Sequence, residues 1–337
     1  MLAGNLLQSL PAEMASCKNL ALLRLSANNF SELPSWLFTL PQLAFLSFAG
    51  NPCASSSSAN GTRTPFGLAH VPWSDLEVQH TLGSGASGVI SQALWKQTPE
   101  YVEEVAVKLF RGSLTSDGTP ADEMAACLAA GCHESLITIL GKIHDHPEEE
   151  GMLEGGLVMQ LIPDSYKVLG QPPSLDTCTR DLFPSESTER LQTGTILSML
   201  TGIAGAAAHL HERGIAHGDL YAHNILASKE DAHALLGDFG AATIYGVGSE
   251  RDCEIEKLEV LAFAHLLEDM LGLVSEDDDS AEGEGVESEP LRKRLWELQK
   301  KCSVPDVGGR PSFEEILEEL EGMMGWRGMM RIPTIPN

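Results

Sequence analysis

The amino-acid sequence predicts an α+β fold in which a strand-rich part precedes a helix-rich part, with a short repeated segment before both. Strand patterns recur at residues 89–95, 105–108 and 157–162. Helical patterns follow, and the longest of them covers residues 191–213. Runs of strands followed by runs of helices are typical of the α+β class.

Composition and charge restrict the classes of function. The 337 residues include 22 basic and 48 acidic side chains, which gives a net charge of −26. This excess of negative charge argues against nucleic acid or an anionic membrane as the main partner. The sequence has no run of about 18 uncharged apolar residues, so we expect no membrane span. Seven scattered cysteines without a Cys-x-x-Cys pair favour a reducing compartment, and we predict a cytoplasmic protein.

The first 53 residues repeat with a period of 23. Asn5, Asn28 and Asn51 are equally spaced, and an apolar residue stands three positions before each of them. This pattern resembles the leucine-rich repeat. The resemblance implies a short α/β solenoid fragment over residues 1–53, which would serve as a partner-binding surface or, alternatively, as a residual cap without a ligand.

Only about two and a quarter repeat units are present, which is too few to bury a stable core alone. We therefore expect this segment either to pack on the next domain or to continue upstream. A Ser-rich stretch after the repeats, with Asn-Gly-Thr behind it, predicts a linker over residues 54–73.

A glycine-rich turn follows the linker. Gly83, Gly85 and Gly88 form a Gly-x-Gly-x-x-Gly pattern, and the β-branched Ile90 stands two positions later. Dinucleotide-binding folds share this pattern but place a helix directly after it, whereas residues 89–95 have the pattern of a second strand. The hairpin favours a phosphate-binding turn, because backbone N–H groups approach a phosphate closely only where no side chain intervenes.

Three further motifs follow in a fixed order. A Val-Ala-Val-Lys strand ends at Lys108, residues 217–224 are His-Gly-Asp-Leu-Tyr-Ala-His-Asn, and Asp-Phe-Gly begins at Asp238. Each motif alone is weak, but in this order after the glycine turn they resemble the protein-kinase signature set. The resemblance covers about residues 74–325.

The resemblance implies a bilobal fold. The N lobe would cover residues 74–162 and the C lobe residues 163–325. Residues 275–290 hold eight acidic side chains with Gly and Ser between them, and this composition predicts a disordered insert. Residues 326–337 would form a tail.

The resemblance also implies ATP and Mg²⁺ as cofactors. Asp219 would accept the proton of the substrate hydroxyl group, and Asn224 and Asp238 would hold Mg²⁺. Lys108 would contact the ATP phosphates.

A glutamate on the helix predicted at residues 122–128 would hold Lys108 in place; Glu123 is the choice, with Asp122 as the alternative. The nucleotide would lie against the glycine turn, the strand lysine and the segment joining the lobes, that is, against Gly83, Gly85, Gly88, Ile90, Lys108, Gln160 and Ile162.

Several positions depart from the family pattern. Gly218 replaces an arginine, Tyr221 stands where many Ser/Thr kinases have a lysine, and His223 stands where tyrosine kinases have an arginine. The Ala-Pro-Glu motif is missing, so Arg310 lacks its usual partner. Glu259 stands where an aspartate is usual, and the short segment before it predicts a reduced platform for peptide substrates.

These observations predict an ATP-dependent protein kinase of the Ser/Thr type that acts on a protein substrate and binds a partner through the repeats. A catalytically weak pseudokinase scaffold is one alternative, favoured by Tyr221 and the short segment after Asp238. A tyrosine or dual-specificity kinase is another, and a kinase-fold enzyme that acts on a small molecule is a third.

Overall fold

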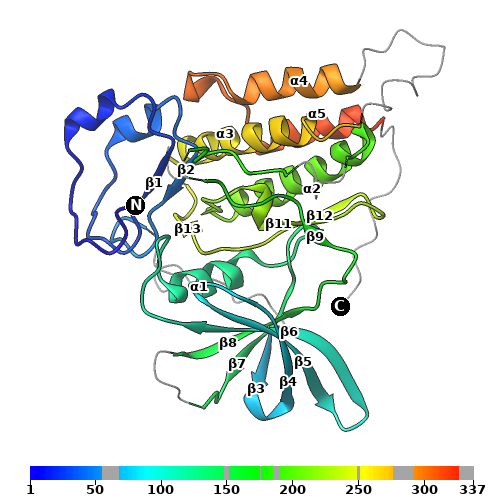
Figure 1. Ribbon diagram of the computed structural model, residues 1–337. Coiled ribbons are helices and arrows are strands. Elements are labelled where there is room, and N and C mark those ends of the chain that lie inside the picture. Colours follow the sequence, from blue (N-terminus) through cyan, green and yellow to red (C-terminus); the bar gives the residue numbers. More distant parts are fainter. Residues whose placement is uncertain are drawn as a thin grey trace, which may run out of the picture.

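The computed structural model describes residues 1–54, 68–147, 152–174, 176–184, 190–248, 251–275 and 291–325. Three parts are visible in Figure 1: the N-terminal segment, a sheet with one helix against it, and a helical part. The N-terminal segment lies beside the helical part, and the sheet lies at the opposite end of the molecule. Apart from Ser275, the predicted acidic insert lies outside the described residues, as does the predicted tail.

The 23-residue period of the N-terminal segment corresponds to a parallel strand pair. Strands β1 (Leu22–Arg24) and β2 (Phe45–Ser47) align so that Leu22 faces Phe45, which is an offset of 23 residues. Short 3₁₀ helices at Ala12–Ser16 and Ser35–Thr39 precede the strands.

Asn28 joins adjacent turns of this segment. Its Oδ1 accepts from the backbone N–H groups of Asn5 (3.0 Å) and Leu7 (2.9 Å). Its Nδ2 donates to the carbonyl oxygens of Leu2 and Leu25, both at 2.8 Å. Asn51 repeats the arrangement one period later, with its Oδ1 accepting from the N–H of Phe30 and its Nδ2 donating to Leu25 and Phe48. A periodic asparagine therefore supplies the bonds that link one turn of the segment to the next.

The predicted strand-rich part is a six-stranded sheet with the order β3-β7-β8-β6-β5-β4. Neighbouring strands are antiparallel, except that β3 runs parallel to β7. Helix α1 (Pro120–Ala130) packs against β6 and β8. The strands are β3 (Ala69–Pro72), β4 (Leu76–Ser84), β5 (Gly88–Thr98), β6 (Tyr101–Arg111), β7 (Ile139–His144) and β8 (Met152–Gln160).

The linker predicted for residues 54–73 is too long at its C-terminal end. Residues 55–67 lie outside the described part of the chain. Residues 69–72 form β3, in which Val71 is fully buried against Ile143. The strand is short and ends in Pro72, which an edge strand tolerates because its missing N–H faces away from the ladder. The proline and the short length obscured the strand pattern in the sequence.

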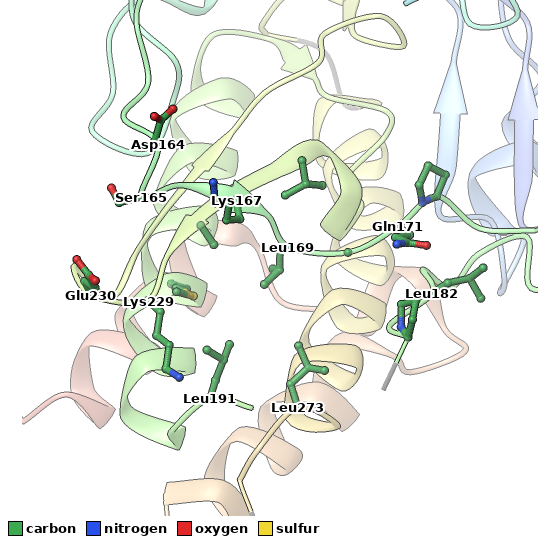
Figure 2. A pocket seen from close by; sticks show the side chains of 16 residues that line it. Asp164, Ser165, Lys167, Leu169, Gln171, Leu182, Leu191, Lys229, Glu230 and Leu273 are labelled. Carbon is green, nitrogen blue, oxygen red and sulfur yellow. The ribbon is translucent and has the colours of Figure 1, made fainter. Parts of the chain in front are cut away.

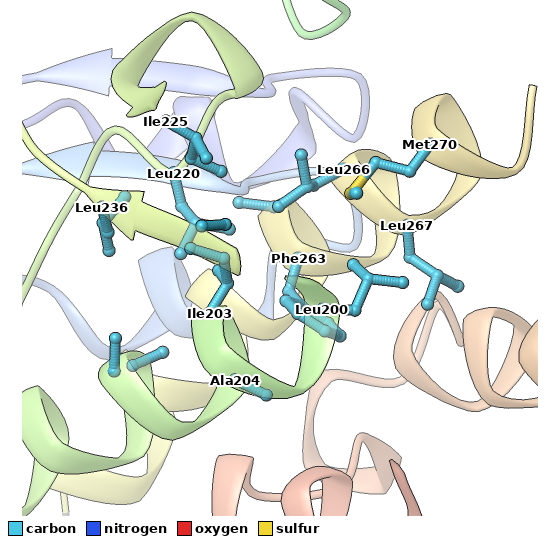
Figure 3. Close-up of a cluster of buried hydrophobic side chains, with 14 of the residues drawn as sticks. Leu200, Ile203, Ala204, Leu220, Ile225, Leu236, Phe263, Leu266, Leu267 and Met270 are labelled. Carbon is cyan, nitrogen blue, oxygen red and sulfur yellow. The ribbon is translucent and has the colours of Figure 1, made fainter. Parts of the chain in front are cut away.

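The helical part is built around α2 (Thr193–Glu212) and α3 (Arg251–Leu271). Their buried side chains pack with those of the loop and strands between them, and Figure 3 shows Leu200, Leu220 and Phe263 in this core. The remaining elements are β9 (Lys167–Val168), β10 (Ile215–Ala216), β11 (Ile225–Ser228), β12 (His233–Leu236), β13 (Thr243–Ile244), α4 (Leu291–Cys302) and α5 (Phe313–Met323).

Helix α2 is long and apolar enough to cross a membrane by length and composition. It is also 61% buried in its most apolar window, with neighbours on β12, α3 and α5. The core helix of a folded domain has the same composition, because it must be apolar on most of its faces.

The N-terminal segment packs on the helical part and shares its apolar core. Leucines of the segment form one buried cluster with Ile255 and Leu258 of α3 and with Val307. Arg251 donates to the Leu33 carbonyl oxygen at 2.8 Å, and the Phe48 N–H donates to Thr243 Oγ1 at 3.0 Å. Of the two arrangements expected for so short a repeat, packing on the next domain is present.

Replacing Asn28 tests whether the asparagine bonds hold the segment together. Asn28→Ala should lower the free energy of unfolding by about 2–4 kcal/mol, since each buried backbone group left without a partner costs about 1–3 kcal/mol. Urea unfolding followed by circular dichroism measures the difference. The matched control is Asn29→Ala, at the exposed neighbouring position; equal losses in the two variants would contradict the role of Asn28.

Candidate functional site

One cavity collects most of the residues that the motifs single out. Its volume is about 230 Å³, and it lies between the β4–β5 turn and the start of the Asp-Phe-Gly motif. The predicted residues that line it are Gly83, Gly85, Gly88, Ile90, Lys108 and Asp238; Ser84, Ala86, Ser87, Thr115, Asp117 and Gly240 line it as well.

The glycine turn leaves its backbone open towards this cavity. A Cβ atom at Gly83 or Gly85 would meet no heavy atom within 4 Å. At Gly88 a Cβ atom would lie 2.2 Å from the Leu109 carbonyl oxygen on the neighbouring strand. Gly88 is therefore required by the close approach of β5 to β6, while the other two glycines keep side chains away from the space where a phosphate would lie.

Lys108 and Glu123 form a buried ion pair, and Glu123 is 1% exposed. Burial alone would lower the pKa of Lys108, but the negative charges of Glu123 and Asp238 and the hydrogen bond to Glu123 outweigh it and raise the pKa. Lys108 is thus held in its charged form at the edge of the cavity.

Asp122, the alternative partner, has a different role. The Thr119 hydroxyl, at the N-cap of α1, donates to Asp122 Oδ2 at 2.6 Å and accepts from the Asp122 N–H at 3.1 Å. Asp122 therefore stabilises the start of the helix, and Glu123 faces the strand.

The loop at residues 217–224 places Asp219 and Asn224 side by side. Asn224 Nδ2 donates to Asp219 Oδ2 at 2.8 Å and to the Asp219 carbonyl oxygen at 2.9 Å. His217 is fully buried, and its Nε2 lies 2.8 Å from the Gly237 carbonyl oxygen, directly before the Asp-Phe-Gly motif. The histidine thus ties the two motifs together.

Glu259 of α3 holds the first part of this loop. Its carboxylate accepts from the N–H groups of His217 (3.2 Å) and Gly218 (2.6 Å) and lies 2.7 Å from His211 Nε2. Burial is the largest influence and raises the pKa of Glu259. The hydrogen bonds from His211 and Gly218, together with the positive charges of His211 and His217, outweigh it and leave the pKa below its usual 4.5.

Asp238 has a left-handed backbone, with φ of 54°, and its Oδ1 accepts from the Gly240 N–H at 3.1 Å. Its carboxylate lines the same cavity as Lys108. Among the described residues no three His, Cys, Asp or Glu side chains form a metal-binding cluster. Asp238 and Asn224 are two oxygen-bearing side chains, which suits Mg²⁺, since this ion is usually held by one or two protein ligands plus substrate phosphates.

The residues predicted to meet the adenine lie at the end of β8 but do not line the 230 Å³ cavity. The Gln160 N–H already donates to the Thr138 carbonyl oxygen at 2.9 Å. Ile162 follows the strand in irregular backbone. Met159, next to them, lines a small apolar cavity of about 70 Å³ with Lys108.

A sequence profile of protein tyrosine and serine/threonine kinases matches residues 76–260, which is more than half of the chain. The chain belongs to this kinase family.

Curated relatives include kinases of both acceptor classes. Proto-oncogene serine/threonine-protein kinase mos of Mus musculus is 25% identical over 174 residues, 51% of this chain and 48% of that protein. Serine/threonine-protein kinase AtPK1/AtPK6 of Arabidopsis thaliana is 32% identical over 171 residues, 50% of this chain and 32% of that protein. Tyrosine-protein kinase Abl of Drosophila melanogaster is 24% identical over 283 residues, 74% of this chain and 16% of that protein. The chain spans less than half the length of these relatives.

The positions that depart from the kinase pattern are occupied by structural contacts. The Tyr221 ring stacks on Phe45 of the N-terminal segment, with centroids 4.0 Å apart and planes 4° apart, and its hydroxyl donates to the Cys178 carbonyl oxygen. Burial raises the pKa of the Tyr221 phenol. His223 Nδ1 lies 2.7 Å from Asp181 Oδ1.

Gly218 has a φ of 74°, and a Cβ atom there would lie 2.6 Å from the Ala241 carbonyl oxygen and 3.0 Å from that of Leu46. The arginine that is usual at this kinase position would therefore collide with the N-terminal segment. Tyr221 and Gly218 therefore form part of the surface on which this segment lies.

Arg24 is the residue that sequence reasoning missed. It is 2% exposed at the end of β1, and it donates to Asp219 Oδ1 through Nη2 and to the Gly218 carbonyl oxygen, at 2.7 Å, through Nη1. Its Nε lies 2.8 Å from Asp117 Oδ1, an ion pair without the angle of a hydrogen bond. A charged residue inside a leucine-rich strand was the available signal, because arginine is rarely buried without a partner.

A larger cavity of about 1020 Å³ lies elsewhere, between the segment that follows β8 and the β11–β12 hairpin. Figure 2 shows Leu169, Leu191 and Leu273 around it, with Lys167 and Lys229 near its edge. None of the motif residues lines this cavity, and it is not the kinase site.

The buried Glu259 carboxylate should make the stability of this kinase pH-dependent. The pKa of Glu259 is lower in the folded state, so as the pH falls the carboxylate takes up a proton in the unfolded chain before it does so in the folded one. The ionised group therefore stabilises the fold above pH 4.5. This contribution is lost as the pH falls through the lower folded-state value. Glu259→Gln should cost about 3 kcal/mol at pH 7, and its deficit relative to the parent should shrink below pH 4.5.

Urea unfolding at a series of pH values measures this deficit. Glu254→Gln, in the same helix, removes the same charge away from the loop and serves as the control. A Glu259→Gln deficit that is constant from pH 7 to the acid limit would contradict the assignment.

Proposed function

We propose that this chain is an ATP-dependent protein kinase that transfers the γ-phosphate of ATP to a serine or threonine hydroxyl group of a protein. One observation carries the proposal: the glycine turn, Lys108 and Asp238 line a single cavity of about 230 Å³. Phosphoryl transfer depends mainly on positioning and on charge stabilisation, and these groups supply both.

The N-terminal half of the site would bind the nucleotide. The backbone of the glycine turn would receive the phosphates, and Lys108, kept charged by Glu123, would pair with them. When bound, Mg²⁺ neutralises charge that develops on the transferred phosphate. Asp238 and the Asn224 Oδ1, for which the described residues offer no partner, would hold it.

The loop at residues 217–224 would act on the acceptor. Asp219 would take the proton from the attacking hydroxyl group, and Asn224 would orient the carboxylate through its bond to Oδ2. Asp219 remains 19% exposed, so one side of the carboxylate stays open to a substrate.

Two kinds of observation bear on the acceptor hydroxyl group. The names of the mouse and Arabidopsis relatives state a serine/threonine kinase, whereas that of the fruit-fly relative Abl states a tyrosine kinase. His223, at the position of the tyrosine-kinase arginine, is bonded to Asp181 and lacks that guanidinium. We therefore favour Ser/Thr specificity.

A catalytically weak scaffold is the second candidate. It is favoured by the stacking of Phe45 on Tyr221, because the N-terminal segment then occupies part of the surface beside Asp219. Such a protein would bind nucleotide without efficient transfer.

We further propose that residues 1–53 are a leucine-rich-repeat fragment. The 23-residue register of β1 and β2 and the repeated asparagine bonds support this assignment. Because one side of the fragment packs on the kinase domain, a protein ligand would bind its other side. We place the protein in the cytoplasm, on the charge and cysteine content of the sequence.

Phosphate transfer tests the activity directly. With labelled ATP, Mg²⁺ and casein or myelin basic protein, Asp219→Asn and Asp238→Asn should each lower transfer by about 100-fold or more. Asp75→Asn, on the N lobe away from the cavity, is the control. Phosphoamino-acid analysis should find phosphoserine or phosphothreonine. Equal transfer by the parent and both site variants would remove the active-kinase proposal in favour of the scaffold.

Nucleotide binding is tested separately by thermal unfolding. At a Mg-ATP concentration of about 100 times its Kd, binding should stabilise the parent by about 2.7 kcal/mol. The double variant Lys108→Met with Glu123→Gln should not be stabilised by Mg-ATP. Glu123 is replaced as well so that no buried carboxylate is left without its cation. A parent whose unfolding temperature does not respond to Mg-ATP would exclude both candidate functions.

A further inference from the structure

The loop around Asp219 lacks the cations that its sequence positions would ordinarily provide. Gly218 has no side chain, and a Cβ atom there would lie 3.0 Å from the Leu46 carbonyl oxygen. Tyr221 is fixed between Phe45 and the Cys178 carbonyl oxygen.

His223 is the third such position. Its ring is bonded to Asp181 and so is not directed at Asp219. Among the described residues, no side chain at these three positions donates to the Asp219 carboxylate, so a cation that contacts it comes from outside the loop.

Arg24 supplies that charge from a position 195 residues earlier in the chain. One guanidinium nitrogen donates to Asp219 Oδ1, a second donates to the Gly218 carbonyl oxygen, and the third lies beside Asp117. Two hydrogen bonds and an ion pair made by one guanidinium restrict its orientation in a way that lysine could not reproduce.

The contact also defines the orientation of the Asp219 carboxylate. Arg24 engages Oδ1 and Asn224 engages Oδ2, so each oxygen has one donor from the protein. A carboxylate held at both oxygens cannot rotate, and its remaining lone pairs are directed to a defined place. Misplacing a catalytic group by about 1 Å can cost about 100-fold in rate.

Two explanations of this contact are physically distinct. Arg24 could block Asp219 as an inhibitor, or it could hold Asp219 ready. With Arg24 in place, Lys108 and Glu123 are paired, and Lys108, Asp238 and the glycine turn surround one cavity. Asp117, the other carboxylate on Arg24, lines that same cavity. The nucleotide side of the site is thus assembled while the N-terminal segment is docked, which favours the second explanation.

We propose that Arg24 is a positioning residue for phosphoryl transfer, which the N-terminal segment inserts into the kinase domain to orient Asp219. The inference rests on the proposed function, and it makes residues 1–53 a required part of the catalytic unit.

The experiment compares the kinetics and the thermal unfolding of the full chain with those of three variants, using Mg-ATP and the acceptor protein that the parent phosphorylates. Arg24→Ala should lower kcat by about 100-fold, with KM for ATP within about threefold of the parent. Methylguanidinium added to Arg24→Ala should restore part of kcat, since it can fill the vacated site. Arg24→Lys should retain the fold and recover only part of kcat.

The matched control is Arg251→Ala, since Arg251 also anchors the N-terminal segment, through Leu33, but does not touch Asp219. Its kcat should stay within about threefold of the parent. An increase in kcat in the Arg24 variants would show inhibition and overturn the inference. An unchanged kcat in the Arg24 variants would also overturn it. The same holds for a loss of kcat that Arg251→Ala shares and that methylguanidinium does not restore, and for failure of every Arg24 variant to fold. A parent no more active than Asp219→Asn would remove the proposed function and the inference together.

Discussion

A buried guanidinium is the constraint on which the arrangement of this molecule depends. Arg24 is 2% exposed, and a charge removed from water is tolerated only if hydrogen bonds and opposite charges replace the lost hydration. Its partners are Asp219, the Gly218 carbonyl oxygen and Asp117, all outside the N-terminal segment. Neither the segment nor the kinase domain alone provides hydrogen-bonding and charged partners for all of these groups. The apolar clusters also contain residues of both parts, so neither part buries its apolar side chains alone.

The docked N-terminal segment also accounts for two places where the kinase domain lacks parts of the usual kinase pattern. Arg310 lacks the Ala-Pro-Glu glutamate, and it donates instead to three carbonyl oxygens, of Val304, Lys257 and Pro41. Burial lowers the pKa of Arg310 to about 10, in spite of the nearby Asp306. Pro41 belongs to the N-terminal segment, so the arginine now joins this segment to α3. The stretch after Asp238 is short, so it does not cover the surface of the kinase domain on which the N-terminal segment lies.

Local sequence order was sufficient for several of the strands and for the long helix. The hairpin after the glycine turn, the lysine strand and the long helix at residues 191–213 are all present. Each depends on neighbouring side chains or on backbone rules that operate within a few residues. The strand at Ala69–Pro72 was missed because its stability comes from pairing with β7, about seventy residues away, and from the burial of Val71.

The sequence by itself determined the kinase motifs and the 23-residue period, because their residue types are required by chemistry or by backbone geometry at fixed spacing. It favoured Glu123 over Asp122 as the partner of Lys108 but could not exclude Asp122, which is adjacent on α1. The ion pair between Lys108 and Glu123 in the folded molecule made that choice. Nor could the sequence connect Arg24 with Asp219. That contact is determined by how two separately patterned segments pack, and a buried charge finds its partners only in the folded molecule.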